Sequence, residues 1–469
     1  MPITLSPSAG ATAPRPVSRP IVILLAAACG LAVANLYYAQ PLLHLLAANF
    51  STSSAVVATV VTVTQIGYAA GLVLLVPLGD LLDRRRLVAI VLVVDGIALC
   101  GTALSGSLLI FEVCSLVVGC SSVVAQVLVP LAADLASAER RGRVVGTVMS
   151  GLLLGILLAR TASGLVAAAA GWRTVYWVAA GAMMVLSLTL TVFLPEDPTS
   201  SDLKYLGLLA SAAAMARQEP VLRQRALLGG LAFAAFSATW TTLAFLLAGS
   251  PYRYGTAVIG LFGLVGAAGA LCASFAGRLA DRGWERAASV GFAALVAAAF
   301  LLMIAGRFAL PPLLAGIVVL DIGVQGLGIT NQSLIYRLRE GARSRLNSVY
   351  MTTYFVGGAA GSALGGLLYS DLGWIGVCWL GLGLAVLLIA VAARGPGRAR
   401  GVSPWTKQGF GESTEPLQNH GHAHAPANAH GLQAEGEVAG AQAIEQGAGD
   451  ASTGHPERVP QSDRTAEHI

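Results

Sequence analysis

The stretch VVGTVMSGLLLGILLARTASGLVAAAA, residues 144–170, decides the fold class. It contains 27 residues and one charged side chain, Arg160, whereas about 20 apolar residues are enough for a helix to cross a bilayer. An arginine near the centre of such a helix costs about 2.5–3.5 kcal/mol on insertion scales. The stretch therefore predicts a transmembrane helix in which Arg160 has a role that offsets this cost.

The composition of the whole chain agrees with a membrane protein. Of its 469 residues, 55% are hydrophobic and 11% are charged, against about 25% charged residues in a soluble domain. The hydrophobic residues are spread along the chain, which argues against a single anchor and against a set of soluble domains. The six cysteines all lie in apolar segments and indicate packing residues, not a disulfide framework or a metal cluster.

The apolar stretches predict an all-α polytopic membrane protein with about twelve transmembrane helices. Stretches of spanning length fall at about 20–46, 54–78, 87–105, 107–131, 144–168, 174–194, 226–248, 256–276, 287–305, 311–335, 347–369 and 374–393. The predicted parts are an N-terminal tail (1–19), a six-helix bundle (20–194), a polar linker with a short helical centre (195–225), a second six-helix bundle (226–394) and a C-terminal tail (395–469). The C-terminal tail is poor in large apolar residues, so we expect it to be disordered.

The basic residues predict the orientation of the chain in the membrane. One set of alternate loops holds Arg84 to Arg86, Arg140, Arg141, Arg143, Lys204, Arg217, Arg223, Arg225, Arg278, Arg282, Arg286, Arg337, Arg339, Arg343 and Arg345. The opposite set holds Arg173, Arg253 and Arg307. Seventeen basic residues against three predict that the first set, and with it both termini, lies in the cytoplasm.

The two predicted bundles repeat each other in sequence. GDLLDR (79–84) and GRLADR (277–282) match at an offset of 198 residues. At an offset of 202 residues, the matched pairs are Arg143 and Arg345, Met149 and Met351, Gly155 and Gly357, Gly164 and Gly366, Gly171 and Gly373, and Trp172 and Trp374. A parallel repeat of two halves with a site between them is an architecture of secondary transporters.

At these residues the chain resembles the major facilitator superfamily, over about residues 20–394. The resemblance rests on a loop motif, present as Gly79, Asp83 and Arg84 and again as Gly277, Asp281 and Arg282. The stretches NLYYAQPLL (35–43), TQIGYAAGLVLLVPLGDLLDRRR (64–86) and GWRTVYW (171–177) resemble the drug:proton antiporter-1 branch. The resemblance implies a fold of two six-helix halves that transports a small molecule by alternating access.

The loop motif also has a physical interpretation. An aspartate at the cytoplasmic end of one helix can lie against the positive N-terminus of a helix in the other half. The repeat predicts that Asp83 faces the start of the eleventh span near Asn347, and that Asp281 faces the start of the fifth near Val144. Such contacts would stabilise the outward-open state. The alternative is that the basic residues of the loops only set the topology.

Two positions differ from the patterns of the resembled family. The arginine often found four residues before a glycine in the fourth span is replaced by Ser115, which precedes Gly119. In the fifth span, Arg160 stands where antiporters of the branch typically have the proline of Gly-Pro-x-x-Gly-Gly. These two differences bear on whether the protein exports its substrate. They do not change the expected fold.

Arg160 and Asp321 are the leading candidates for the transport chemistry, because ionisable residues inside spans are functional candidates. At about 1.5 Å per residue, Arg160 lies about 18 Å along the helix from Trp172, and Asp321 lies about 15 Å from Pro311. In the resembled fold the fifth and tenth spans border each other across the two halves. We therefore expect a charge pair that opens during transport, so that Asp321 binds a proton and Arg160 meets an anionic group of the substrate. The alternative is a permanent, purely structural ion pair.

The resemblance implies that substrate contacts come from the first, fourth, seventh and tenth spans. The polar and aromatic candidates there are Asn35, Tyr37, Tyr38, Gln40, Gln126, Trp240, Gln325 and Asn331. Some of them are expected to join helices instead. Pro41 predicts a bend in the first span, and Asp95 in the third is interpreted as a packing or hydrogen-bonding residue.

These features predict a proton-coupled secondary transporter, acting as a monomer, that exports a small organic molecule and needs no cofactor. A phosphate-binding loop is absent, since neither Lys204 nor Lys407 precedes Ser or Thr. The alternatives are import of an organic anion bound by Arg160, and metal-ion efflux suggested by the histidines of HGHAHAPANAH (420–430). A channel is disfavoured by the repeat, and an intramembrane enzyme by the absence of HExxH and GxSxG motifs. Nucleic acid is not an expected partner.

Overall fold

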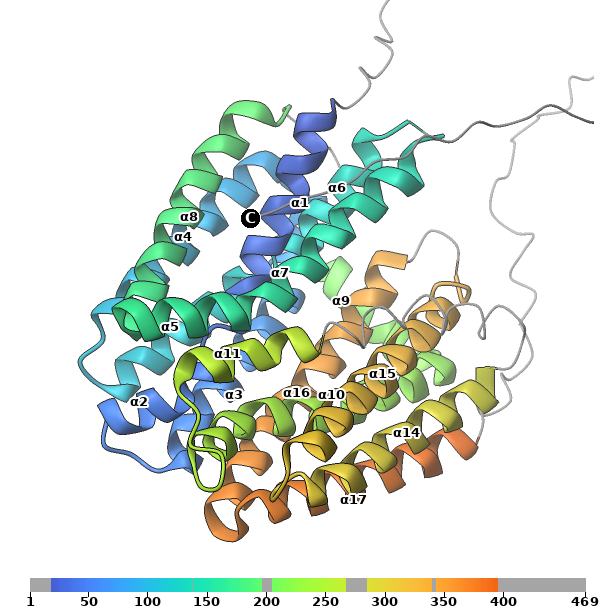
Figure 1. Ribbon diagram of the computed structural model, residues 1–469. Helices are drawn as coiled ribbons and strands as arrows, with labels where there is room; N and C mark the ends of the chain where they lie inside the picture. The colour runs from blue at the N-terminus through green and yellow to red at the C-terminus, as the bar shows by residue number, and fades with distance from the viewer. Residues whose placement is uncertain (1–17, 138, 196–204, 267–284, 340–342, 395–469) are drawn as a thin grey trace, which may run out of the picture. The chain divides into compact units, whose positions relative to one another are not determined.

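The computed structural model describes residues 18–137, 139–195, 205–266, 285–339 and 343–394, and all of their regular elements are helical (Figure 1). In the first half of the chain the helices are α1 (Arg19–Ala34), η1 (Gln40–Leu42), α2 (Leu43–Asn49), α3 (Ser54–Leu74), η2 (Val76–Asp80), α4 (Arg84–Leu104), α5 (Leu108–Ser121), α6 (Val124–Leu135), α7 (Arg141–Ala170) and α8 (Trp172–Phe193). In the second half they are α9 (Tyr205–Gln218), α10 (Pro220–Ala248), α11 (Thr256–Val265), α14 (Glu285–Ala305), α15 (Leu310–Ile335), α16 (Arg343–Leu372) and α17 (Trp374–Ala393).

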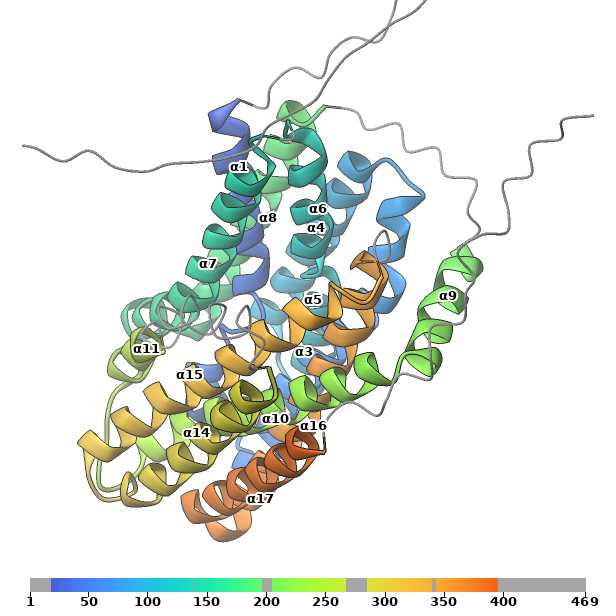
Figure 2. The same cartoon turned by 90° about the vertical axis from the view of Figure 1, so that its right-hand side faces the viewer.

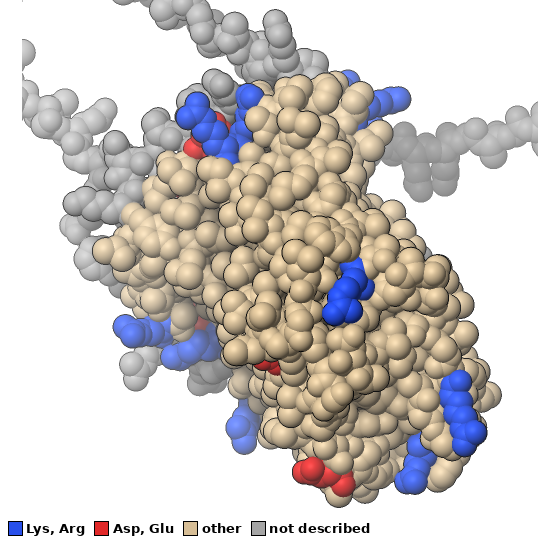
Figure 3. Space-filling model, turned by 90° about the vertical axis from the view of Figure 1, so that its left-hand side faces the viewer, with Lys and Arg blue, Asp and Glu red and all other residues tan. Residues whose placement is uncertain are grey.

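The helices have the length and composition of membrane spans. Within the described residues, nine helical segments are long and apolar enough to cross a bilayer, and α1 and α11 are shorter apolar helices. The face of the protein in Figure 3 is largely free of charged side chains, as expected of a surface in contact with lipid. Eleven of the twelve stretches predicted to span the membrane overlap one of these helices, and the twelfth, 347–369, lies within α16. The all-helical membrane fold is therefore confirmed.

The first span is broken in the region where a bend was predicted. Helix α1 ends at Ala34, and regular helical structure resumes in η1, whose second residue is Pro41. The fourth span is broken as well, between the end of α5 at Ser121 and the start of α6 at Val124. Pro41 lies at the end of the first break and cannot donate a backbone hydrogen bond to the preceding turn.

Two matched glycines of the sequence repeat make the same turn. Gly171 between α7 and α8 has φ 86°, and Gly373 between α16 and α17 has φ 64°. Only glycine adopts such values without strain, so each allows a long helix to end and the next to start at once. Trp172 and Trp374, which follow them, are both buried. The repeat therefore reflects a shared helix–turn–helix geometry.

A second matched pair of glycines lets helices touch backbone to backbone. Helix α7 packs on α1, where a Cβ at Gly155 would collide with the backbone of Gly30. Helix α16 packs on α10, where a Cβ at Gly357 would collide with the backbone of Gly230. Small residues at helix crossings are typical of membrane proteins, because close packing replaces the hydrophobic effect there.

The contacts between the halves concentrate near the helix ends predicted to be external. Helix α3 packs on α16, α7 packs on α11, and η1 and α2 contact α10. Thr161 Oγ1 donates to the Gly260 carbonyl at 3.1 Å, and Gln65 Nε2 donates to Ser237 Oγ at 2.8 Å. Toward the arginine-rich ends a cavity of about 420 Å³ lies between α3, α9 and α16. Helix α9 borders this cavity and packs against α16 (Figure 2).

Candidate functional site

Arg160 lies on α7 and is buried, with 5% of its surface exposed. Its Nε donates a hydrogen bond to Gln40 Oε1 at 2.6 Å. The guanidinium carbon lies 4.1 Å from the ring centroid of Trp240, 4.8 Å from that of Tyr37 and 5.7 Å from that of Phe236. One amide oxygen and three aromatic faces therefore stabilise the buried charge.

The broken first span and α10 bring these partners to Arg160. Tyr37 and Gln40 lie in the segment between α1 and α2, whose irregular backbone turns both residues toward α7. Phe236 and Trp240 are one helical turn apart on α10, so they present a continuous aromatic surface. Helix α11 packs directly against Arg160, because a Cβ at Gly263 would lie 2.8 Å from the Cβ of Arg160.

Asp321 lies on α15 and is also 5% exposed. A Cβ at Gly266 would contact both the Asp321 carboxylate and the six-membered ring of Trp240, so these two side chains border the same space. Asp321 Oδ1, Arg160 Nη2 and Trp240 Nε1 are buried and make no hydrogen bond to any described residue. Trp240 thus contacts the cation through its ring face and lies beside the carboxylate.

Arg160 and Asp321 come from opposite halves and lie within electrostatic reach of each other. They are not in direct contact: within the described part of the chain, no carboxylate oxygen lies within 4.0 Å of the Arg160 guanidinium. Both residues are buried in helices that contain the predicted fifth and tenth spans. In this conformation Gln40 and Trp240 take the place beside Arg160 that was expected for Asp321, and the role of the pair stays a prediction.

The space beside Arg160 is small in this conformation. A cavity of about 10 Å³ is lined by Gln40, Pro41, Arg160, Trp240, Leu243, Ala244 and Ile259. That is about the volume a single water molecule needs. A substrate at Arg160 therefore requires movement of the surrounding helices.

The other five predicted binding residues lie in four separate places. Asn35 and Tyr38 lie next to Asp95. Gln126 donates to Tyr68 Oη at 3.3 Å and accepts from Asn347 Nδ2 at 3.4 Å, which joins the halves. Gln325 is half-buried on α15 and makes no side-chain hydrogen bond to a described residue. Of the eight candidates, the structure brings Tyr37, Gln40 and Trp240 to Arg160.

Asn331 lies beside a second buried arginine, whose position was predicted wrongly. Arg225 was assigned to a cytoplasmic loop, but it lies inside α10 and is 4% exposed. It donates to Ser289 Oγ at 2.8 Å and to Asn331 Oδ1 at 3.5 Å. Hydropathy could not reveal this, because Arg225 is close to the helix end and its partners are distant in sequence.

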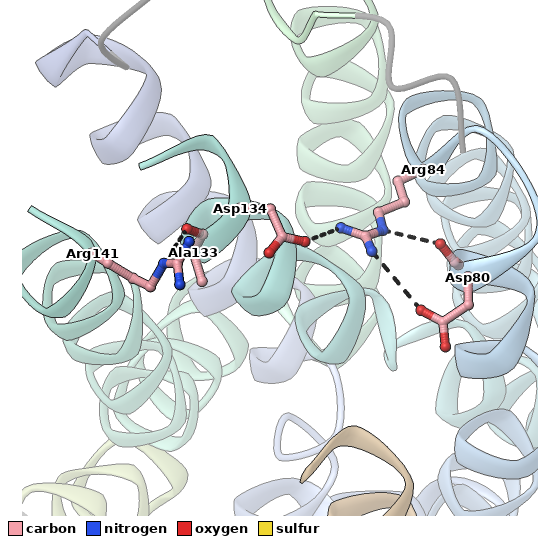
Figure 4. A network of polar contacts seen from close by, with 6 residues as sticks. Asp80, Arg84, Ala133, Asp134 and Arg141 are labelled. Carbon is pink, nitrogen blue, oxygen red and sulfur yellow. Dashed lines mark hydrogen bonds and ion pairs between the residues drawn. The ribbon is translucent and has the colours of Figure 1, made fainter. Parts of the chain in front are cut away.

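The described copy of the loop motif forms a polar network around Arg84 (Figure 4). Arg84 donates to the Gly79 carbonyl at 3.0 Å and to Asp134 at 2.7 Å, and it lies 3.9 Å from Asp80. Nearby, Arg141 Nε donates to the Ala133 carbonyl at 3.0 Å. The contacts of Arg84 link η2, α4 and α6 within one half, and the bond from Arg141 joins α6 to α7.

Asp83 is the N-cap residue of α4 in this conformation. Its carboxylate accepts from the Arg85 amide at 3.0 Å and lies 3.5 Å from Arg86 Nε. Asn347, the predicted neighbour of Asp83, instead accepts from Tyr336 Oη and donates to Gln126. Asp80 and Arg345 line the cavity of about 420 Å³ at this end. Gly277, Asp281 and Arg282 of the second copy lie outside the described residues.

A metal site finds no support in the described ranges, where no cluster of three or more His, Cys, Asp or Glu residues could hold a metal ion. The histidines at 420–430 lie outside those ranges.

Comparisons with known proteins agree with this architecture. The profile described as Major Facilitator Superfamily matches residues 22–342. The chain is 48% identical over 379 residues to the Uncharacterized transporter YgaY of Escherichia coli O157:H7, covering 81% of this chain and 96% of that protein. It is 35% identical over 366 residues to the Probable transporter SCO4007 of Streptomyces coelicolor, covering 77% and 85%.

A solved structure with a similar fold is that of the nucleoside transporter NupG. The TM-score is 0.64 at 14% sequence identity, and the match covers 80% of this chain and 99% of the other. The profile, the two relatives and the helical architecture lead to one conclusion: the chain belongs to the major facilitator superfamily of membrane transporters.

Proposed function

We propose that this secondary transporter couples the export of a small organic molecule to the entry of protons. The observation that carries the proposal is the pair of buried, opposite charges Arg160 and Asp321, each with a polar atom that lacks a partner among the described residues. They come from opposite halves, so movement of the halves changes the distance between them. Such a pair can bind a proton and a substrate in alternation.

The energetics explain why unpaired charges at this depth favour a ligand. Removing charges from water costs several kcal/mol per ion, and the cost is recovered only by good partners. A proton on Asp321 removes one charge, and an anionic or strongly accepting group at Arg160 Nη2 compensates the other. Each event changes the attraction between the halves, which is how binding can bias their movement.

The chemical surroundings indicate the kind of molecule. Tyr37, Phe236 and Trp240 form an aromatic wall around the guanidinium. Aromatic walls favour a substrate with an apolar or planar body. The transported molecule is therefore an organic compound that carries an acceptor group, such as a carboxylate, beside an apolar part.

The direction of transport rests on the resemblance to the drug:proton antiporter-1 branch in residues 35–43, 64–86 and 171–177. We place the protein as a monomer in the bacterial inner membrane with both termini in the cytoplasm, which the distribution of basic residues supports. In that orientation the halves are closed on the outer side, and the cavity of about 420 Å³ faces the cytoplasm.

The second candidate function is proton-coupled import of a small organic anion. The unpartnered Arg160 Nη2 favours it, because a guanidinium without a carboxylate partner among the described residues is suited to an anionic substrate.

The third candidate, metal-ion efflux, depends on the histidines of the tail. If deletion of residues 401–469 leaves metal resistance of producing cells unchanged, that candidate loses its support.

The experiment that separates the first two functions is proton flux in vesicles. Everted membrane vesicles are energised and then offered antibiotics, sugars, amino acids and organic acids while the internal pH is followed. Substrate-driven proton release from acidified vesicles supports exchange. Proton movement in the same direction as an organic acid supports import. If no compound moves protons at any pH, proton coupling is wrong.

A further inference from the structure

Asp95 is a fully buried carboxyl group that the proposed transport site does not use. It lies near the middle of α4 with 0% of its surface exposed. Asn35 Nδ2 donates to its Oδ2 at 2.7 Å, and Ser121 Oγ lies 2.8 Å from its Oδ1. Within the described residues it forms no ion pair with a basic side chain. An ionised carboxylate with neutral partners alone is costly at this depth, whereas a protonated one is not.

The hydrogen bonds around Asp95 can be satisfied with and without a proton on it. Ser121 Oγ has one proton, yet it lies 2.8 Å from Asp95 Oδ1 and 2.7 Å from the Val117 carbonyl. When Asp95 is ionised, the hydroxyl donates to Oδ1. When Oδ1 carries a proton, that proton is donated to Ser121 Oγ, and the hydroxyl proton turns to the Val117 carbonyl. Asn35 donates to Oδ2 in both states, so the exchange loses no hydrogen bond on Asp95.

The titratable surroundings of Asp95 are neutral groups. Tyr38, in the segment after α1, lies within electrostatic reach of Asp95, and Tyr176 on α8 lies within electrostatic reach of Tyr38. From α5 the group that faces Asp95 is the Ser121 hydroxyl. Within the described ranges, no basic side chain lies within 4.0 Å of the Asp95 carboxylate. The charge state of Asp95 is thus not fixed by a permanent counter-ion from these ranges.

The position of Asp95 connects it to two helix breaks. Asn35 is the first residue after α1, and Ser121 is the last residue of α5. The segment that begins at Asn35 also carries Tyr37 and Gln40, which contact Arg160. A change of hydrogen bonding at Asp95 therefore acts on the segment that positions the partners of Arg160.

We propose that Asp95 is a second proton-binding site, separate from Asp321, in which Asn35 and Ser121 accommodate both the protonated and the ionised carboxyl group. Binding of the proton follows from the local geometry alone. Its use in transport rests on the proposed function.

Infrared difference spectroscopy of the purified full-length protein in lipid bilayers tests this proposal without a substrate. Spectra recorded at high and low pH are subtracted, and the carbonyl band of protonated carboxyl groups is compared between variants. We expect a pH-dependent band that is present in the wild type and in Asp321→Asn and absent in Asp95→Asn. A spectrum of Asp95→Asn identical to that of the wild type would overturn the proposal, and so would an Asp95 band that does not change with pH.

Ser121→Ala gives an independent answer if Asp95→Asn does not fold. Loss of the Ser121 hydroxyl removes one partner of the carboxyl group, so the pH-dependent band that persists in Asp321→Asn should shift in frequency. An unchanged band in Ser121→Ala contradicts the proposed geometry. Absence of proton flux in vesicles together with an intact Asp95 band would count against the proposed function and leave the proton site in place.

Discussion

The hydrogen bond between Arg160 and Gln40 should be measurable as a coupling energy. Its length is 2.6 Å, both residues are buried, and it joins α7 to η1. A hydrogen bond to a charged group contributes about 1.5–3 kcal/mol. Gln40→Leu removes the acceptor and leaves the aromatic contacts of Arg160 in place, so we expect the free energy of unfolding to fall by about 2–3 kcal/mol.

A double-mutant cycle separates this bond from the other effects of the substitutions. Gln40→Leu, Arg160→Met and the double variant are unfolded reversibly in lipid–detergent micelles, and the three losses of free energy are compared. We expect Gln40→Leu to have little effect once Arg160 is absent, which gives a coupling of about 1.5–3 kcal/mol.

Gln325→Leu is the matched control, because Gln325 makes no side-chain hydrogen bond to a described residue. Its effect should stay within about 0.5 kcal/mol. If the Gln40 and Arg160 losses add to within about 0.5 kcal/mol, the bond does not stabilise the fold and this description of the site is incorrect.

Two further predictions concern stability, both measured by thermal unfolding. Gly155→Ala should destabilise the protein by about 1–3 kcal/mol, because the added Cβ collides with the backbone of α1. In the control Gly146→Ala, on the same helix, the added Cβ meets nothing within 4 Å, so the change should be neutral or stabilising by up to about 1 kcal/mol. Equal effects of the two substitutions would argue against the close crossing of α7 and α1. Arg84→Ala should cost about 1–2 kcal/mol, since Arg84 bonds both Gly79 and Asp134. Asp134→Asn should cost less than about 1 kcal/mol, because its side chain is 60% exposed, and the reverse order would contradict the network.

Much of the fold could be predicted from the sequence, because hydropathy and repeats report on what the bilayer requires of the chain. Residues 144–170 were predicted as a span and form most of α7. The matched glycines Gly171 and Gly373 were predicted as equivalent positions and make equivalent turns. The burial of Arg225 could not be predicted, since a charged residue near a helix end has the same sequence signal whether it is in a loop or buried.

The candidate site could be predicted only in part. Counting residues along a helix predicts a depth for Arg160 and for Asp321, but it does not predict the direction in which either side chain points. The hydrogen bond from Arg160 to Gln40 depends on the irregular backbone between α1 and α2, which has no periodic signal in the sequence. The partners of Asp95 lie at two helix breaks, and their convergence could be found only in three dimensions.

The central claim is that Arg160 and Asp321 carry substrate and proton during transport, and variant proton flux tests it most directly. In everted vesicles supplied with a compound that moves protons through the wild type, we expect Asp321→Asn to abolish the coupled proton movement. We expect Arg160→Ala to lower substrate-driven flux at least about tenfold, corresponding to about 1.4 kcal/mol of lost interaction. Wild-type coupling in both variants, at equal amounts of folded protein, would contradict the claim.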